Sequence, residues 1–367
     1  GSVTSNGALL TVQQSPVIVT PPSSQLACEG STVTLSVVAT GAGLSYQWYQ
    51  GVTLLAGETG SSLSLLNVNS ATSGSYTVEV TGLCGGPVTS AAATVTINEN
   101  PEITGQPVSS VICETGNTSF TVNAGVTTGA VYQWELSVDG GLTYSPITNV
   151  GIYSGATTST LILTGVPLSS TGTLYRAVIT GSCSGSVTSN GALLTVQQSP
   201  VIVTLPLDAT ICETNNVQFT VVAVGTGLTY QWRENGVPIS DGGIYSGTST
   251  STLVLTSVPN SFNGNLYDVV VTGSCGSITT SPEASLTVNR IPDVLASDAT
   301  ICSGQSTSIS ITNPNVVTGT VFSWVVQTSS NVTGANAGTG TSITDLLTVT
   351  DGVSSGSVTY LITPSAA

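Results

Sequence analysis

Hydrophobic and polar residues alternate along most of the chain in short runs that are separated by turns rich in glycine, serine and threonine. Because side chains point to opposite faces at every second position of an extended chain, this alternation predicts half-buried β-strands. In the first repeat the predicted strands lie at residues 33–39, 44–49, 62–68, 74–81 and 91–97. The sequence therefore predicts an all-β fold.

A Tyr-Gln-Trp tripeptide recurs after an alternating run and a glycine- and threonine-rich turn. Three copies end at Trp48, Trp134 and Trp232, and a weaker fourth copy, Phe-Ser-Trp, ends at Trp324. The intervals are 86, 98 and 92 residues (134−48, 232−134 and 324−232). This is the size of an immunoglobulin-like β-sandwich, which buries a tryptophan in its third strand. We therefore expect tandem immunoglobulin-like sandwiches with one of these tryptophans in each core.

The repeats divide the chain into four domains and a leading segment. Short linkers that end in proline connect the domains, and proline favours an extended backbone, so we expect an extended rod. The predicted ranges are the last strand of a preceding immunoglobulin-like repeat at 1–15, immunoglobulin-like domains at 16–98, 99–198 and 199–290, and a domain that lacks its final strand at 291–367.

One segment occurs twice. Residues 1–20 are identical to residues 185–204, so we expect residues 1–15 to belong to a preceding repeat of a longer natural protein. The fourth repeat stops where the next-to-last strand of the others lies. Either a continuation of the natural chain supplies its missing strand, which is the simpler expectation, or a strand from another molecule fills the gap. Residues 1–15 are a candidate for such a strand.

Charged residues are few and mostly acidic. Three arginines, no lysine and no histidine accompany 18 carboxylates, which gives a formal net charge of −15. No basic patch can form to neutralise phosphates, so nucleic acid and anionic membrane surfaces are poor partners. No apolar run approaches the roughly 20 residues that span a bilayer, so we expect no membrane insertion of this segment.

The residue types that carry most enzyme chemistry are scarce. Without histidine there is no Ser-His-Asp or Cys-His pair, and the acidic residues are scattered singly. The cysteines also occur singly and without Cys-x-x-Cys spacing, which argues against zinc. We therefore predict that the chain is not an enzyme and binds no cofactor.

Two kinds of turn are weak candidates for binding. Asp139 and Asp241 each precede two glycines, but each supplies a single carboxylate where a calcium ion needs several oxygens. A turn-forming role is expected, with a weak Ca²⁺ site as the alternative. Tyr153 and Tyr245 lie in a repeated Gly-Ile-Tyr-Ser-Gly turn, where packing against the sandwich is expected and stacking on a sugar ring is the alternative.

A recurring order of motifs surrounds the cysteines. It includes Cys-Glu-Gly at 28–30, Gly-Ser-Tyr at 74–76 and Gly-Ser-Cys at 181–183, with the Tyr-Gln-Trp copies between them. Over its whole length the chain resembles the tandem immunoglobulin-like and PKD-like repeats of giant Bacteroidota surface adhesins, a group that includes the gliding adhesins. The fourth repeat looks closer to the PKD-like kind. The resemblance implies an exported protein, a substrate of type IX secretion, located at the cell surface.

The disulfide of antibody-type domains, which joins the middle of strands B and F, is missing here. Aliphatic residues occupy these positions, so apolar packing is expected to replace the disulfide. The pairs are Val37 and Val78, Val122 and Ala177, Val221 and Val269, and Ile311 and Ile362.

The cysteines instead fall near the predicted domain ends. One set lies in the turn before strand B, and the other in the turn after strand F. Since strands B and F run in the same direction, these turns lie at opposite ends of a domain, roughly 20–30 Å apart. A disulfide needs Cα atoms within about 4.4–6.8 Å. The two sets are Cys28, Cys113, Cys212 and Cys302, and Cys84, Cys183 and Cys275.

End-to-end stacking of the domains predicts disulfides between neighbours. We expect Cys28 to pair with Cys183 and Cys113 with Cys275, and the partners of the other three cysteines to lie outside this sequence. The alternative is pairing within each domain: 28 with 84, 113 with 183, and 212 with 275. Either scheme needs an oxidising, extracellular environment.

The preferred function is a structural stalk segment of a very large extracellular adhesin or surface filament, which holds a distal binding region away from the cell and bears load. Its partners would be neighbouring repeats of the same chain, with a surface, glycan or protein ligand bound through other regions. The alternatives are a carbohydrate- or protein-binding module and spacer domains of a secreted hydrolase.

Overall fold

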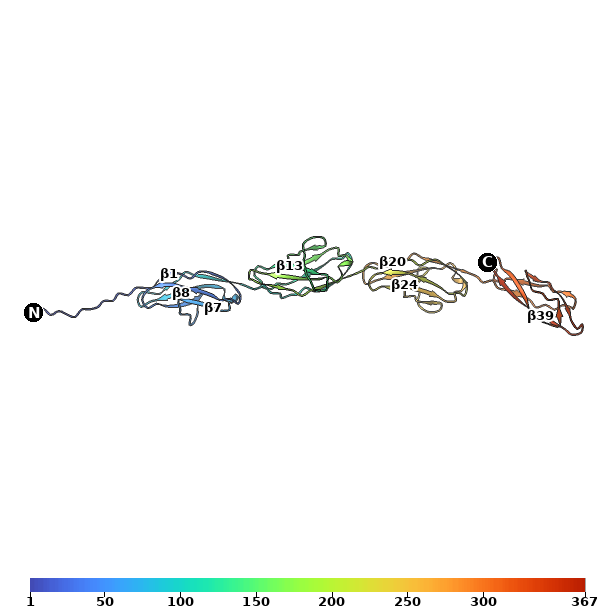
Figure 1. Cartoon of the computed structure of the whole chain (residues 1–367), viewed down its shortest axis with the longest axis horizontal. Coiled ribbons are helices and arrows are strands. Elements are labelled where there is room, and N and C mark those ends of the chain that lie inside the picture. The colour runs from blue at the N-terminus through green and yellow to red at the C-terminus, as the bar shows by residue number, and fades with distance from the viewer. Residues whose placement is uncertain (367) are drawn as a thin grey trace. The chain divides into compact units, whose positions relative to one another are not determined.

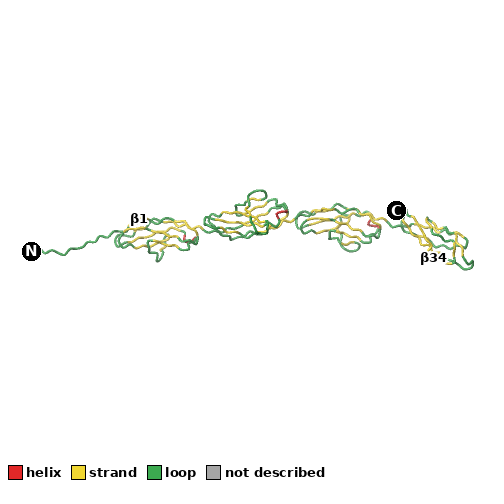
Figure 2. Tube along the Cα trace, in the orientation of Figure 1, coloured by secondary structure: helices red, strands yellow, loops and turns green. Residues whose placement is uncertain are grey.

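The computed structural model describes residues 1–366, and nearly all of its regular structure is β-strand (Figures 1 and 2). The described residues also include three single-turn 3-10 helices, η1 (Ser70–Thr72), η2 (Leu168–Ser170) and η3 (Asn260–Phe262). The chain divides into two compact units, one of residues 1–197 and one from residue 198 onward, and each contains two domains. The predicted all-β fold is confirmed.

The first domain has a large sheet in the order β2-β10-β8-β5-β6, with β9 beside β8, and two further strand pairs, β1–β4 and β3–β7. Its last strand, β10, pairs antiparallel with β8 and parallel with β2. The strands are β1 (Val17–Thr20), β2 (Gln25–Cys28), β3 (Val33–Ser36), β4 (Val38–Thr40), β5 (Ser45–Gln50), β6 (Thr53–Leu54), β7 (Ser62–Leu65), β8 (Gly74–Thr81), β9 (Val88–Thr89) and β10 (Ala93–Asn98).

The second domain repeats this plan, with the orders β11-β19-β17-β13-β14 and β12-β16-β15, and with β18 beside β17. Its last strand, β19, again lies between an antiparallel and a parallel neighbour, β17 and β11. The strands are β11 (Ser110–Cys113), β12 (Thr118–Thr121), β13 (Val131–Ser137), β14 (Ser145–Pro146), β15 (Tyr153–Ser154), β16 (Thr160–Leu163), β17 (Leu174–Thr180), β18 (Ser186–Thr188) and β19 (Ala192–Gln197).

The third domain has the orders β21-β30-β28-β24-β25 and β22-β27-β26, a pair β20–β23, and β29 beside β28. We call β10, β19 and β30 the closing strands, because each fills the space between its two neighbours. The strands are β20 (Val201–Thr204), β21 (Ala209–Cys212), β22 (Val217–Thr220), β23 (Val222–Val224), β24 (Thr229–Glu234), β25 (Val237–Pro238), β26 (Tyr245–Ser246), β27 (Thr252–Leu255), β28 (Leu266–Thr272), β29 (Thr279–Thr280) and β30 (Ala284–Asn289).

The fourth domain has no closing strand among its described residues. Its sheets have the orders β31-β33-β37, β32-β38-β35 and β36-β34-β39, so β39 is an edge strand. The strands are β31 (Leu295–Ala296), β32 (Gln305–Ser306), β33 (Ile309–Thr312), β34 (Val321–Ser330), β35 (Val332–Thr333), β36 (Gly338–Thr339), β37 (Ser342–Ile343), β38 (Leu346–Val349) and β39 (Ser357–Ser365).

A tryptophan lies in the core of each domain. The exposed fraction is 0% for Trp48, Trp134 and Trp232 and 8% for Trp324. Each indole N–H donates to a backbone carbonyl, as from Trp232 to Thr250 over 2.9 Å. Each also lies across the sheet from the strand-F member of an aliphatic pair; these partners are Val78, Ala177, Val269 and Ile362.

All residues of the aliphatic pairs are buried except Ile362, which is half-buried. The apolar packing expected in place of a core disulfide is therefore present in the first three domains and less complete in the fourth.

The repeated segment has different structures in its two copies. Residues 192–197 form β19, where Leu194 is 0% exposed, whereas the identical residues 8–13 form no strand and leave Leu10 84% exposed. Residues 1–15 therefore form no strand in this structure, and their membership of a preceding repeat stays a prediction. The reason is physical, since the strands that pair with β19 have no counterpart beside residues 8–13.

Each domain has a tyrosine two residues before the aliphatic residue of strand F. The hydrogen-bond partner of its hydroxyl differs from one domain to the next. Tyr76 donates to the Thr72 carbonyl, and the Tyr175 hydroxyl lies 3.1 Å from that of Tyr153. Tyr267 donates to Glu234 over 2.6 Å and Tyr360 to Asp345 over 2.6 Å. The pKa of each of these four tyrosines is raised, mainly by burial.

Alkaline titration is expected to distinguish these tyrosines from the exposed ones. Because the folded state raises their pKa above the ordinary value near 10, it favours the neutral phenol. The resulting stabilisation is complete below pH 10 and is lost as the pH rises further. Absorbance at 295 nm should show fewer ionised tyrosines in the native chain than in urea at pH 11, and equal curves would contradict the prediction.

Candidate functional site at the domain junctions

A disulfide joins the first domain to the second. Cys28 is the last residue of β2, and Cys183 lies in the turn between β17 and β18. Their Cα atoms are 5.7 Å apart, although 155 positions separate them in the sequence. This is the preferred pairing between neighbouring domains. The bond fixes the end of one sandwich to the facing turn of the next.

The linker beside this disulfide is hydrogen-bonded by both domains. The Glu29 N–H donates to the Asn98 carbonyl over 2.9 Å, and the Asn100 side chain donates to the Glu29 carbonyl over 3.3 Å. From the second domain, the Thr128 hydroxyl accepts the Glu99 N–H over 2.8 Å. The Sγ atom of Cys183 lies 3.4 Å from the Asn98 carbonyl oxygen. The linker is thus part of the packed junction.

Two carboxyl groups meet at this junction. The pKa of Glu99 is raised by partial desolvation, by a hydrogen bond with Glu29 and by the negative charge of Glu29. Since the folded pKa lies above the ordinary value, this contact contributes stability at low pH and loses it as the pH rises through the folded pKa. Ionisation of Glu99 therefore weakens its contact with Glu29.

The states of the remaining cysteines exclude the alternative scheme, in which each disulfide would lie within one domain. Cys113 and Cys275 are both in disulfide bonds. Cys113 belongs to the first compact unit and Cys275 to the second. Their pairing with each other stays a prediction. Cys84, Cys212 and Cys302 are free thiols. Each pairing within a domain would need a free cysteine or Cys183, so none of those pairs forms.

One detail of the cysteine placement was wrong. The first set was expected in the turn before strand B, but Cys28, Cys113 and Cys212 each end a short strand, β2, β11 or β21. These strands exist because they pair in parallel with the closing strand of the same domain. A parallel partner 70, 84 or 77 residues away along the chain (95−25, 194−110 and 286−209) leaves little local signal.

The junction between the third and fourth domains is held by polar contacts. The Ile291 N–H donates to a Glu213 carboxylate oxygen over 2.9 Å. Arg290 donates to the Asn260 side chain over 2.8 Å and to the Asn315 carbonyl over 3.3 Å. Cys212 occupies the place of Cys28 here but is free. This junction therefore has hydrogen bonds in place of a covalent bond.

The acidic turns use their carboxylates internally. Asp139 accepts from the Ser137 hydroxyl over 2.6 Å and from the Thr143 N–H and hydroxyl, and these hydrogen bonds lower its pKa. Asp241 accepts from the N–H and hydroxyl of Thr248, which also lowers its pKa. Both carboxylates stabilise their own loops. Within residues 1–366 no group of three or more His, Cys, Asp or Glu side chains is placed to hold a metal ion.

The two turn tyrosines pack against their own domains. The Tyr153 ring lies 6.1 Å from that of Tyr175. Tyr245 lies 6.2 Å from the Phe262 ring and donates to Glu234 over 2.8 Å. Both rings are half-buried, as expected for packing residues.

No helix in the described part of the chain is long and apolar enough to cross a membrane.

Comparisons with known proteins agree with this architecture. Residues 14–101 match the family "Ig-like domain CHU_C associated", residues 105–198 match a domain of unknown function, and residues 299–367 match the family "PKD-like domain". The search of curated proteins found no match.

Solved structures of tandem immunoglobulin domains are similar to the chain. An I-band fragment of titin is 17% identical and covers 75% of this chain and 99% of its own, with a TM-score of 0.55. A mutated variant of that fragment, also 17% identical, covers 76% of this chain and 100% of its own, with a TM-score of 0.56. The chain is thus a tandem array of immunoglobulin-like domains followed by a PKD-like domain, and the titin likeness shows the fold alone.

Proposed function

We propose that this chain is a load-bearing stalk segment of a very large extracellular adhesin or surface filament. The observation that carries the proposal is the Cys28–Cys183 disulfide, which links two consecutive domains end to end. In this role the segment holds a distal binding region away from the cell. The sequence resemblance to gliding adhesins of the Bacteroidota, exported by type IX secretion, agrees with such a role.

The disulfide changes how tension passes through the first two domains. A pulling force that enters before Cys28 passes through the S–S bond to Cys183 and bypasses the chain between them. The two domains then cannot be drawn apart unless a covalent bond breaks. The hydrogen-bonded linker opposes bending at the same place. Both properties suit a semi-rigid spacer under load.

The surface chemistry supports a structural role over a catalytic one. The candidate polar groups in the turns are engaged within their own domains, as shown by Asp139, Asp241 and Tyr245. The three arginines likewise have partners: Arg176 contacts Glu135 over 2.8 Å, Arg233 contacts Asp268, and Arg290 contacts Asn260. We therefore propose that the segment needs neither a catalytic group nor a cofactor.

Interdomain bending tests the stalk role. A Cys28→Ser, Cys183→Ser double variant is expected to bend more at the first junction, which small-angle scattering would register as a broader distribution of interatomic distances. Cys84→Ser is the matched control, because Cys84 is a free thiol in the same domain. An unchanged profile in the double variant would argue against a stiffening disulfide. Retained affinity on a glycan array would favour the binding-module alternative.

A further inference from the structure

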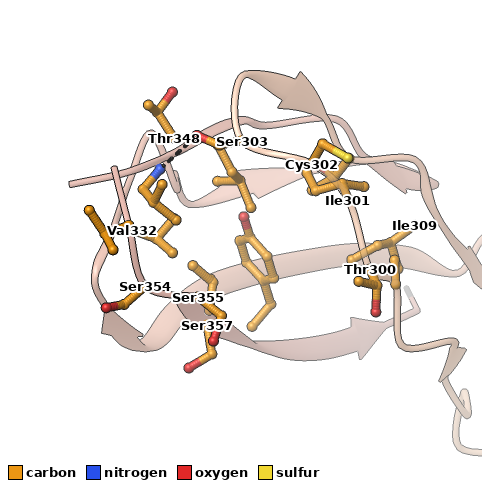
Figure 3. A pocket seen from close by; sticks show the side chains of 18 residues that line it. Thr300, Ile301, Cys302, Ser303, Ile309, Val332, Thr348, Ser354, Ser355 and Ser357 are labelled. Carbon is orange, nitrogen blue, oxygen red and sulfur yellow. Dashed lines mark hydrogen bonds between the residues drawn. The ribbon is translucent and has the colours of Figure 1, made fainter. Parts of the chain in front are cut away.

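The main cleft of the fourth domain has an unreactive lining. It has a volume of about 560 Å³ and is lined mostly by serine, threonine and aliphatic side chains (Figure 3). The Ser303 hydroxyl accepts the Val349 N–H over 3.1 Å. The Tyr360 hydroxyl donates to Asp345 over 2.6 Å. A more reactive chemical group occurs elsewhere in the chain, in its Asn-Gly pairs.

The sequence contains four Asn-Gly pairs, and three of them lie within domains. Asn190 lies between β18 and β19 of the second domain. Asn235 and Asn263 lie in turns of the third domain, and the fourth pair precedes the first domain. In such a pair the glycine nitrogen can attack the asparagine side chain, because glycine has no side chain to block the approach. The hydrogen bonds of each pair therefore decide whether this reaction can occur in the folded chain.

The two pairs of the third domain are held in place. The Asn263 Oδ1 atom accepts the Val288 N–H over 2.9 Å, and the Gly264 N–H donates to a carbonyl of β30 over 2.8 Å. The Asn235 Oδ1 atom accepts the Leu266 N–H over 3.0 Å. Each carboxamide is thus fixed to a backbone group that is not the following nitrogen. At least one hydrogen bond must break before either pair can react.

The pair of the second domain lacks these restraints. Within residues 1–366 neither the Asn190 side chain nor the Gly191 N–H has a hydrogen-bond partner, and both residues are exposed. Asn190 is held by its main chain, since its N–H donates to the Gln106 side chain over 2.8 Å and its carbonyl accepts from the Ser189 hydroxyl over 3.0 Å. Exposure alone does not distinguish this pair, because the two asparagines of the third domain are exposed as well.

We propose that Asn190 is a site of spontaneous deamidation in the folded protein and that its isoaspartate product loosens the second domain. The Gly191 nitrogen loses its proton and bonds to the Asn190 Cγ atom, the bond from Cγ to Nδ2 breaks, and ammonia leaves with that proton. The succinimide ring formed in this way is opened by water. Opening at Cγ gives aspartate, and opening at the main-chain carbonyl gives isoaspartate. The reaction consumes only water and does not depend on the load-bearing role.

Isoaspartate disturbs a buried hydrogen bond at this position. Ser189 is buried, and its hydroxyl accepts the Ala177 N–H over 2.8 Å while it donates to the Asn190 carbonyl over 3.0 Å. In isoaspartate the main chain runs through the former side chain and is one methylene longer, so this carbonyl is displaced. A buried hydroxyl that loses its acceptor destabilises the folded state. The aspartate product adds a charge but leaves the main chain unchanged.

The first domain provides a matched control. At the corresponding position Ser90 donates to the Ala91 carbonyl over 2.9 Å, so alanine supports the same hydrogen bond. Asn190→Ala should therefore fold like the unaltered chain but cannot deamidate. Asn190→Asp adds the charge without the longer main chain. Gly191 is left unchanged, because an added Cβ would lie 2.8 Å from the Tyr144 hydroxyl.

Incubation of the full chain in ¹⁸O-labelled water tests the site, because the label marks residues that are hydrolysed during the incubation. Tandem mass spectrometry of tryptic peptides then measures the label at each pair. We expect conversion at Asn190 to be about tenfold faster than at Asn235 and Asn263, where one or two hydrogen bonds must break first. In urea, where these hydrogen bonds are lost, the three rates should converge.

Brief digestion with trypsin after the incubation tests the effect on the domain. Chains that are cleaved after Arg176 should be enriched in isoaspartate at position 190 relative to intact chains, because cleavage follows the open population. Cleavage of Asn190→Ala and of Asn190→Asp should not increase with incubation time. The proposal is overturned if Asn190 is converted no faster than the two pairs of the third domain, or if the cleaved chains are not enriched in isoaspartate.

Discussion

In a chain carrying Cys113→Ser and Cys275→Ser, reduction of the Cys28–Cys183 disulfide is expected to release about 510–560 Å of extensible chain. The bond spans 155 positions, and an extended residue covers roughly 3.3–3.6 Å. While the bond is intact, tension bypasses this stretch, so unfolding of either domain cannot lengthen it. The two substitutions are needed because Cys113 and Cys275 are also in disulfide bonds. Single-molecule force spectroscopy with handles at the two ends measures the difference in contour length.

Adding Cys28→Ser to the same chain provides the control. This variant should show the longer extension with and without reductant, whereas adding Cys84→Ser should leave the redox difference intact, since Cys84 is a free thiol. Equal contour lengths for the oxidised and reduced parent chain would contradict the proposed path of tension. Such a result would remove the main support for the stalk function.

The positions of the cores could be predicted from the sequence because their signals are local. Alternating residues mark the strands, and a tryptophan marks the third strand of each domain. The sequence also favoured the pairing of Cys28 with Cys183 over pairing within each domain, because the expected strand directions place the two sets of cysteines at opposite ends of a domain. A bond within one domain would have required a separation that disulfide geometry does not allow.

The strands β2, β11 and β21 could not be predicted, because each has four residues and depends on a distant parallel partner. The repeated segment makes the same point, since identical residues form a strand at 192–197 and none at 8–13. Strand formation there is decided by the neighbours that cover Leu194, which no local pattern reveals. This context dependence is typical of β-structure.

The contacts at the junctions could not be predicted from the sequence either. Glu29 follows a cysteine, and nothing in the sequence shows that its backbone joins the linker or that its carboxyl group meets Glu99. The partners of Tyr267 and Tyr360 differ from that of Tyr76, although the three tyrosines occupy equivalent positions. Such side-chain partners depend on loops whose conformations the repeat does not specify.

Replacement of Trp232 by alanine is expected to destabilise the third domain by about 3–5 kcal/mol, the usual cost of removing a fully buried tryptophan. Trp232 is 0% exposed, lies 6.4 Å from the Phe219 ring and donates to the Thr250 carbonyl. Because a small domain is stable by only about 5–15 kcal/mol, this loss is a large part of its stability. The domain should therefore remain folded on average but open far more often.

Trypsin measures this opening in individual domains, because the chain has three arginines and no lysine. Arg233 follows Trp232 in β24, where its guanidinium contacts Asp268, and cleavage there requires the third domain to open. When opening is fast relative to cleavage, the rate follows the open population. The expected loss of stability then corresponds to a rise of about 10²-fold to 10³-fold or more in cleavage after Arg233.

Trp134→Ala is the reciprocal control. Arg176 of β17 belongs to the second domain, so this variant should accelerate cleavage after Arg176 and leave cleavage after Arg233 unchanged. The reverse should hold for Trp232→Ala, because the two sites lie in different compact units. Acceleration at both sites in either variant would mean that the domains open together. Unchanged cleavage after Arg233 in Trp232→Ala would mean that the aliphatic residues around Val269 hold the core without the indole.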